Sequence, residues 1–140
     1  MAVLARRDDL GREATGAGGA RGADRLVRLV DLAADDVGRP HMIELFTTLS
    51  AEATDRDHPA HAFFTDRYRR TVDEIAQAYQ AAREEGALRT GIEPDDAARE
   101  LIALMDGLQV QWLYDPDRVD LVALLRGHLD RQLVVTGESD

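Results

Sequence analysis

The chain has 140 residues and a formal net charge of −10, with no cysteine and no lysine: all 17 basic residues are arginine. Disulfides, thiolate metal sites, thiol nucleophiles and Schiff bases are therefore excluded. Because affinity for nucleic acid depends largely on cations that replace phosphate counterions, a chain this acidic is a poor DNA ligand by itself.

Hydrophobic periodicity predicts an all-α fold of about six helices. A short charged helix is expected at 2–12, followed by a glycine-rich connector at 15–22. Apolar residues then recur at three- and four-residue spacing, which predicts longer helices at 24–37, 40–53, 59–85, 94–114 and 116–134. No segment alternates convincingly with the two-residue period of a strand.

Proline and glycine mark the expected helix ends. Proline suits the first helical turn, where its missing N–H would be unpaired anyway, and we expect this position for Pro40, Pro59, Pro94 and Pro116. Gly86 is expected to end the helix 59–85, with Leu88 making a hydrophobic cap contact. A tight turn at 115–116 would join the last two helices into a pair.

The segment 101–116 is apolar around nearly its whole circumference. A surface helix shows one apolar stripe, so this helix must be covered on every side, in part by a second subunit or a ligand. The last helix carries two apolar rows and could pack inward and outward at once. We therefore predict an intersubunit four-helix bundle. Its expected interface residues are Gly107, Leu108, Leu121, Val122, Leu125 and Leu129.

Gly107 is unusual because it lies in the middle of a predicted helix, where glycine costs about 1 kcal/mol relative to alanine. Either another helix or a ligand approaches the backbone closely at this point, or the glycine is only tolerated. Its neighbour Asp106 either is solvated or pairs with an arginine across the interface.

Catalytic and metal-binding signatures are weak. His58 and His61, with Asp55 and Asp57 nearby, have the side chains of metal ligands, but a third ligand from elsewhere is missing. His58 is better explained as a polar residue at a helix start. Ser50 lacks the strained turn and the G-x-S-x-G pattern of a nucleophile. We therefore expect no enzyme activity, no metal and no other cofactor.

Two segments resemble the regulatory domain of TetR-family transcriptional regulators. The run MDGLQVQWL at 105–113, closed by Asp115 and Pro116 and followed by an amphipathic helix, is similar to the last two helices of that family. The run GRPHMIELF at 38–46 is similar to the start of a central helix. The resemblance extends over about 2–133, and the family's N-terminal helix-turn-helix domain is expected to be missing.

The resemblance also implies a ligand cavity, which in that family is walled by the middle helices and the penultimate helix. The residues expected to line it are Met42, Phe46, Phe64, Tyr68, Met105, Gln109 and Trp112. The amide of Gln109 needs hydrogen-bond partners on a helix with otherwise apolar faces, so it either pairs across the dimer interface or faces the ligand. The effector is expected to be small and mostly apolar, with a polar group that meets Gln109 or Tyr68.

The predicted function is that of an effector-binding and dimerisation domain of a TetR-like regulator, with DNA bound only through a domain that this chain lacks. We expect a domain at 23–135, preceded by the connector region 1–22 and followed by a polar tail at 136–140. A cytoplasmic homodimer without membrane contact is expected. The alternatives are a standalone module that forms mixed dimers with an intact regulator and a small helical enzyme.

Overall fold

The computed structural model describes residues 21–134, which form an all-α fold, as the periodicity predicts. The helices of this part are α2 (Gly22–Val37), α3 (Pro40–Glu52), α4 (His61–Glu84), α5 (Pro94–Tyr114) and α6 (Leu121–Gln132). The only β pairing within 21–134 is one isolated antiparallel bridge between Leu88 and Leu133. The helix predicted at 2–12 and the tail at 136–140 lie outside the described residues. None of the helices described is long and apolar enough to cross a membrane.

Two of the four prolines occupy the expected first helical turn. Pro40 begins α3 and Pro94 begins α5. Pro59 instead lies in a turn, in which His58 Nδ1 accepts a hydrogen bond of 3.0 Å from the Ala60 N–H, and α4 begins only after it. This agrees with the interpretation of His58 as a polar residue near a helix start.

The prediction that a helix begins at Pro116 is wrong. Residues 115–120 form a loop, and α6 begins at Leu121, where the Asp120 side chain accepts a hydrogen bond of 3.0 Å from the Ala123 N–H. Asp120 thereby satisfies one of the free N–H groups of the first turn, which a proline cannot do. The connection between α5 and α6 is therefore longer than the expected tight turn.

The carboxyl end of α4 has the hydrogen-bond pattern of a Schellman motif. The Ala87 N–H donates to the Ala82 carbonyl at 2.8 Å, and the Gly86 N–H donates to the Arg83 carbonyl at 3.1 Å. Gly86 has a φ of 75°, a conformation that costs glycine little. Ala82, Ala87 and Leu88, the residue predicted to make the hydrophobic cap contact, are all buried in the main core beside this motif.

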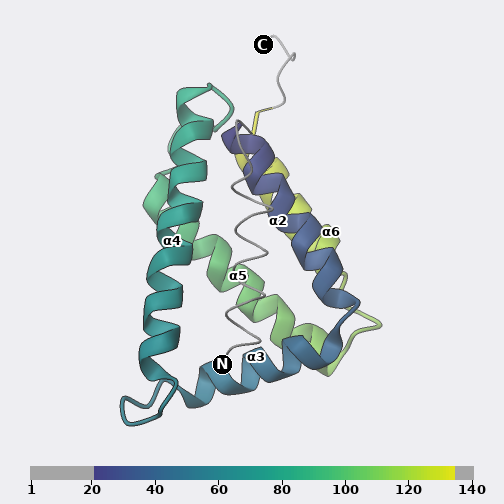
Figure 1. Ribbon diagram of the computed structural model, residues 1–140. Coiled ribbons are helices and arrows are strands. Elements are labelled where there is room, and N and C mark those ends of the chain that lie inside the picture. Colours follow the sequence, from purple (N-terminus) through teal and green to yellow (C-terminus); the bar gives the residue numbers. More distant parts are fainter. Residues whose placement is uncertain (1–20, 135–140) are drawn as a thin grey trace.

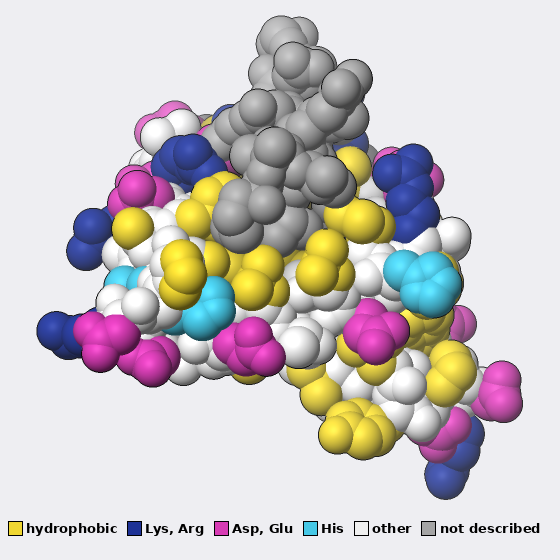
Figure 2. All heavy atoms as spheres, turned by 60° about the horizontal axis from the view of Figure 1, so that its bottom comes forward, with side chains coloured by type: hydrophobic (Ala, Val, Ile, Leu, Met, Phe, Trp, Pro, Cys, Tyr) yellow, Lys and Arg dark blue, Asp and Glu magenta, His cyan; other side chains and the backbone are white. Residues whose placement is uncertain are grey.

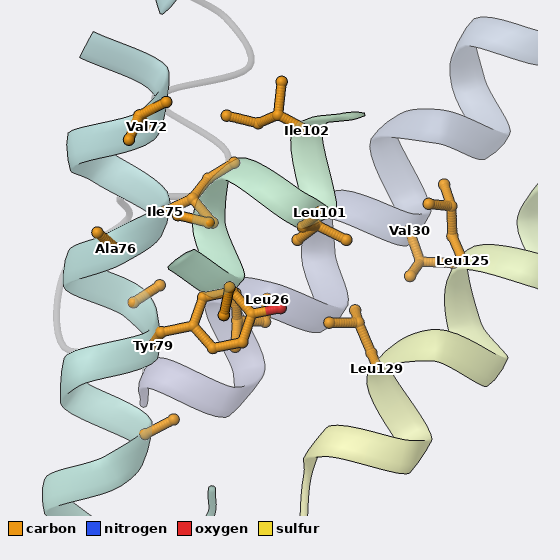
Figure 3. Close-up of a cluster of buried hydrophobic side chains, with 14 of the residues drawn as sticks. Leu26, Val30, Val72, Ile75, Ala76, Tyr79, Leu101, Ile102, Leu125 and Leu129 are labelled. Atoms are coloured by element: carbon orange, nitrogen blue, oxygen red, sulfur yellow. The ribbon is translucent and has the colours of Figure 1, made fainter. Parts of the chain in front are cut away.

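The main core lies between two helix layers. Figure 1 shows α6 behind α2 and the start of α5 behind α4, while α3 runs across the lower end. Side chains from α2, α4, α5 and α6 converge between these layers (Figure 3). Tyr79 of α4 is fully buried there, and its hydroxyl donates a hydrogen bond of 2.5 Å to Gln132 Oε1 at the end of α6.

The burial pattern revises the predicted dimer interface. Four of its leucines face the core of their own chain and are at most 6% exposed: Leu108, Leu121, Leu125 and Leu129. They are not accessible to a second copy, because the row of α6 that contains three of them packs against α2 and α5. Gly107 is exposed and Val122 is half-buried. The large apolar residues that do face outward on these two helices are Val110, Tyr114 and Leu124.

Candidate ligand-binding site

A groove with a volume of about 410 Å³ lies where α3, α4 and α5 meet. This volume is within the range of sites for small molecules. The lining side chains are mixed, with aromatic, hydroxyl, amide and carboxyl groups. They are Phe46, Thr47, Ser50 and Ala51 of α3, Thr54 just after that helix, Tyr68 of α4, and Asp106, Gln109 and Val110 of α5.

The carboxyl group of Asp106 is the charged group of this groove. It accepts a hydrogen bond of 2.6 Å from the Tyr68 hydroxyl, which joins α4 to α5. Burial raises the pKa of Asp106, while the Tyr68 hydrogen bond and the positive charge of Arg67 act in the opposite direction. Burial and the neighbouring Asp106 both raise the pKa of Tyr68, so the phenol keeps its proton and remains the donor.

The aromatic wall of the groove is formed by Phe46, which packs against Phe64 in an edge-to-face arrangement with ring centroids 5.5 Å apart. Phe63 packs in the same way on Phe64, at 5.2 Å. The guanidinium carbon of Arg67 lies 4.3 Å from the centroid of the Phe46 ring, in a cation–π arrangement. One face of Phe46 is therefore already occupied by a cation of the protein itself.

Two hydroxyl groups, one in α3 and one just after it, donate hydrogen bonds to backbone carbonyls. Ser50 Oγ donates to the Thr47 carbonyl at 3.1 Å, and Thr54 Oγ1 donates to the Ala51 carbonyl at 2.8 Å. Their oxygen lone pairs remain available as acceptors.

Gln109 of α5 brings an amide group to the same groove. Its side chain is only 7% exposed. Burial of an amide is costly unless its donors and acceptors have partners, so a polar group of a ligand in the groove would be favourable here.

The residues predicted for the cavity divide into two groups. Phe46, Tyr68 and Gln109 line the groove. Phe64 and Met42 belong to the aromatic cluster that packs behind Phe46.

The other two predicted residues lie elsewhere. Met105 packs against the main core. Trp112 lines a second groove of about 360 Å³ between the end of α2 and the 116–122 segment, together with Val37 and Val122.

Asp106 and the hydroxyls of Thr47, Ser50 and Thr54 also line the groove, although the sequence did not indicate them. Asp106 is predicted to be solvated or to pair with an arginine across an interface, whereas its hydrogen-bond partner is Tyr68 of the same chain. The signal that could have located it is the one used for Gln109, a polar residue within an apolar helix.

No histidine is among the residues that line this groove. His61 Nδ1 is 2.8 Å from the Ala53 carbonyl and serves the turn before α4. Within 21–134 no group of three or more histidine, aspartate or glutamate side chains has the arrangement of a metal site. His128 of α6 has a buried Nε2 atom without a partner among the described residues, and burial lowers its pKa, but α6 contributes nothing to the groove.

The surface around α3 carries much apolar area. In Figure 2, which brings the α3 side of the molecule forward, hydrophobic side chains gather in the middle of the face and charged ones lie mostly toward its edges. Leu45 of α3 is 48% exposed.

The helical architecture described above is that of a regulatory domain of transcriptional regulators. A family model described as "BetI-type transcriptional repressor, C-terminal" matches residues 22–134. The chain belongs to this family of TetR-type regulators, which confirms the resemblance drawn from its sequence and places it among regulators and not among enzymes.

A solved structure supports the same assignment. The chain is similar to a transcriptional regulator from Saccharomonospora viridis, solved in complex with choline, with 25% sequence identity and a TM-score of 0.65. The similarity covers 94% of this chain and 71% of that chain. No curated protein matches the chain.

Proposed function

We propose that this domain binds a small organic cation in the groove between α3, α4 and α5, and that this ligand is the effector of a TetR-type regulator. The observation that carries the proposal is Asp106, a half-buried carboxyl group at the wall of a groove of suitable volume. A cation replaces some of the hydration that the carboxylate has lost, because opposite charges attract strongly at a site of low dielectric.

Two further observations support a cationic ligand. The net charge of −10 favours the approach of cations over anions. The similar regulator from Saccharomonospora viridis is in complex with choline, which is a cation. The presence of Asp106 also changes the expectation of a mostly apolar ligand, since an apolar group placed against this carboxylate would leave it without solvation.

Isothermal titration calorimetry on the full chain tests this proposal with choline and N,N-dimethylethanolamine, both cationic at pH 7. We expect saturable binding of at least one of them, weakened about tenfold or more by Asp106→Asn, since a charged contact is lost. Asp73→Asn removes the same charge from an exposed position on α4 and should leave binding unchanged. Absence of binding, or equal binding by Asp106→Asn, would refute the proposal.

We further propose that the domain forms a homodimer through the outer faces of α5 and α6. Ala103, Gly107, Val110 and Tyr114 are exposed at spacings of four, three and four residues, so they share one face of α5. Leu124 of α6 is 49% exposed. An apolar face of this kind on adjacent helices is typical of a subunit interface.

Size-exclusion chromatography with light scattering tests the dimer. The wild-type chain should have twice its mass of 15.5 kDa. Leu124→Glu should shift it to the monomer, because a carboxylate in the interface would be desolvated without a partner. Ala34→Glu, at an exposed site of α2, is the matched control and should stay dimeric. A dimeric Leu124→Glu variant would place the interface elsewhere.

DNA binding is proposed to require a helix-turn-helix domain, which residues 21–134 do not contain. The acidity of the chain supports this, since phosphate contacts need arginine or lysine in excess.

A further inference from the structure

The hydrogen-bonding groups that line the groove restrict the class of cation further than the negative charge of Asp106 does. The relevant property is the balance between hydrogen-bond donors and acceptors on the lining side chains. Three hydroxyl groups already donate their protons in hydrogen bonds within the protein: Tyr68 to Asp106, Ser50 to the Thr47 carbonyl and Thr54 to the Ala51 carbonyl. Each can offer only lone pairs to a ligand.

The carboxylate adds to this excess of acceptors. Ionised aspartate has no proton to donate, and Tyr68 uses only one of the sites on the Oδ2 atom of Asp106. The donors that remain among the lining side chains are the amide of Gln109 and the hydroxyl of Thr47. A ligand that fits this groove must therefore bring hydrogen-bond donors of its own.

The groove also lacks the aromatic surfaces that a cation without N–H groups needs. Quaternary ammonium ions are held by the faces of several aromatic rings. Among the described residues only Phe46 and Tyr68 bring rings to the groove, and Arg67 already occupies one face of Phe46. Phe46 also packs edge-to-face with Phe64, so the ring is fixed in that position.

We propose that the groove selects a protonated amine that still carries N–H groups and discriminates against quaternary ammonium ions. This inference rests on the proposed function, because it presupposes that the groove binds a small cation. In the bound state an N–H of the ligand donates to a carboxylate oxygen of Asp106, and its other donors meet the lone pairs of Tyr68 and Ser50. A quaternary ion would place methyl groups against these acceptors and leave them desolvated without partners.

A ligand series that exchanges N–H for N–CH₃ one step at a time tests this inference. The series is ethanolamine, N-methylethanolamine, N,N-dimethylethanolamine and choline, each titrated into the full chain at pH 7, where the amines are protonated. We expect the dissociation constant to rise about tenfold or more at the last step, from the tertiary to the quaternary ion, because the last charged N–H is lost there.

Asp106→Asn provides the second measurement. In this variant the step between N,N-dimethylethanolamine and choline should shrink, since the carboxylate that receives the N–H is gone, whereas Asp73→Asn should keep the step at its wild-type size. Choline binding as tightly as the tertiary amine, or more tightly, would overturn the inference while leaving the cation site intact. If no member of the series bound, the proposed function itself would fail.

Discussion

Gly22 at the start of α2 lies directly against the backbone of Ala82 in α4. A Cβ atom on Gly22 would be only 2.4 Å from the Ala82 nitrogen and 2.5 Å from the Ala78 carbonyl oxygen. The Gly22 N–H also donates a hydrogen bond of 3.0 Å to Glu85 Oε1. Glycine is therefore required at this position by close helix packing, and not by a turn.

Gly22→Ala should lower the free energy of unfolding by about 1–3 kcal/mol, because the two backbones must separate to admit a methyl group. Urea denaturation followed by circular dichroism measures this. Gly127→Ala is the control: its Cβ would be 3.5 Å from the Arg131 guanidinium, an ordinary contact, and helix propensity should make it neutral or stabilising by up to about 1 kcal/mol. Equal effects of the two substitutions would contradict the packing argument.

Tyr79→Phe should lower the free energy of unfolding by about 1–2 kcal/mol. The substitution removes the hydroxyl that donates to Gln132 Oε1 and leaves that oxygen without its partner on a side chain that is only 8% exposed. Chemical denaturation again provides the measurement. Tyr114→Phe, made in the Leu124→Glu background that should be monomeric, removes the same hydroxyl from a side chain that is 88% exposed and should have no effect there. A Tyr79→Phe variant of unchanged stability would show that water replaces the lost donor.

Asp106→Asn should stabilise the ligand-free protein at pH 7 even though it weakens cation binding. The pKa of Asp106 is raised in the folded state, so folding favours its neutral form. Its contribution to stability is therefore greatest below its ordinary pKa of 3.8 and falls as the pH rises through the folded pKa. An asparagine remains neutral at every pH and can still accept the Tyr68 hydrogen bond.

The measurement is the free energy of unfolding of both proteins between pH 4 and pH 7. The advantage of Asp106→Asn should grow with pH over the lower part of this range and then stay constant. A loss of stability at pH 7 would mean that Arg67 and Tyr68 compensate the burial of the carboxylate fully. The predicted gain equals the stability that the wild-type chain loses because it buries a charged carboxylate in the groove. Such losses are common at binding sites.

Gly107→Ala distinguishes the two interpretations of this mid-helix glycine. A Cβ atom on Gly107 would meet no atom of a neighbouring segment within 4 Å, so the substitution causes no clash in the monomer. If the outer face of α5 packs closely in the dimer, as we propose, Gly107→Ala should raise the dimer dissociation constant about tenfold, as measured by light scattering across a dilution series. An unchanged dimer with higher thermal stability would show that the glycine is only tolerated.

The sequence is sufficient for the fold class and for most helix ends because periodicity and proline positions act locally. Pro94 and Pro40 predict the starts of α5 and α3 correctly. Pro116 fails because Asp117 and Asp120 both resemble cap residues, and the choice of Asp120 depends on how α6 packs against α2.

The candidate site is less accessible from the sequence, since it depends on contacts between distant segments. Phe46, Tyr68 and Gln109, which the family resemblance indicates, line the groove. The pairing of Tyr68 with Asp106 joins residues on two different helices, and no local pattern encodes it. The two apolar rows of α6 likewise do not indicate which row faces its own core, which is why buried leucines enter the predicted interface.

Both ends of the described chain are hydrogen-bonded to the carboxyl end of α4. Glu85 receives the hydrogen bond of Gly22, and the Ala87 carbonyl accepts a hydrogen bond of 2.8 Å from the Val134 N–H. Residues 22 and 134 are thus fastened to positions only two residues apart. This point lies about 25 Å along α4 from Tyr68, at a rise of about 1.5 Å per residue. A short peptide could therefore join these two positions, and a label attached at Val134 would stand well clear of the groove.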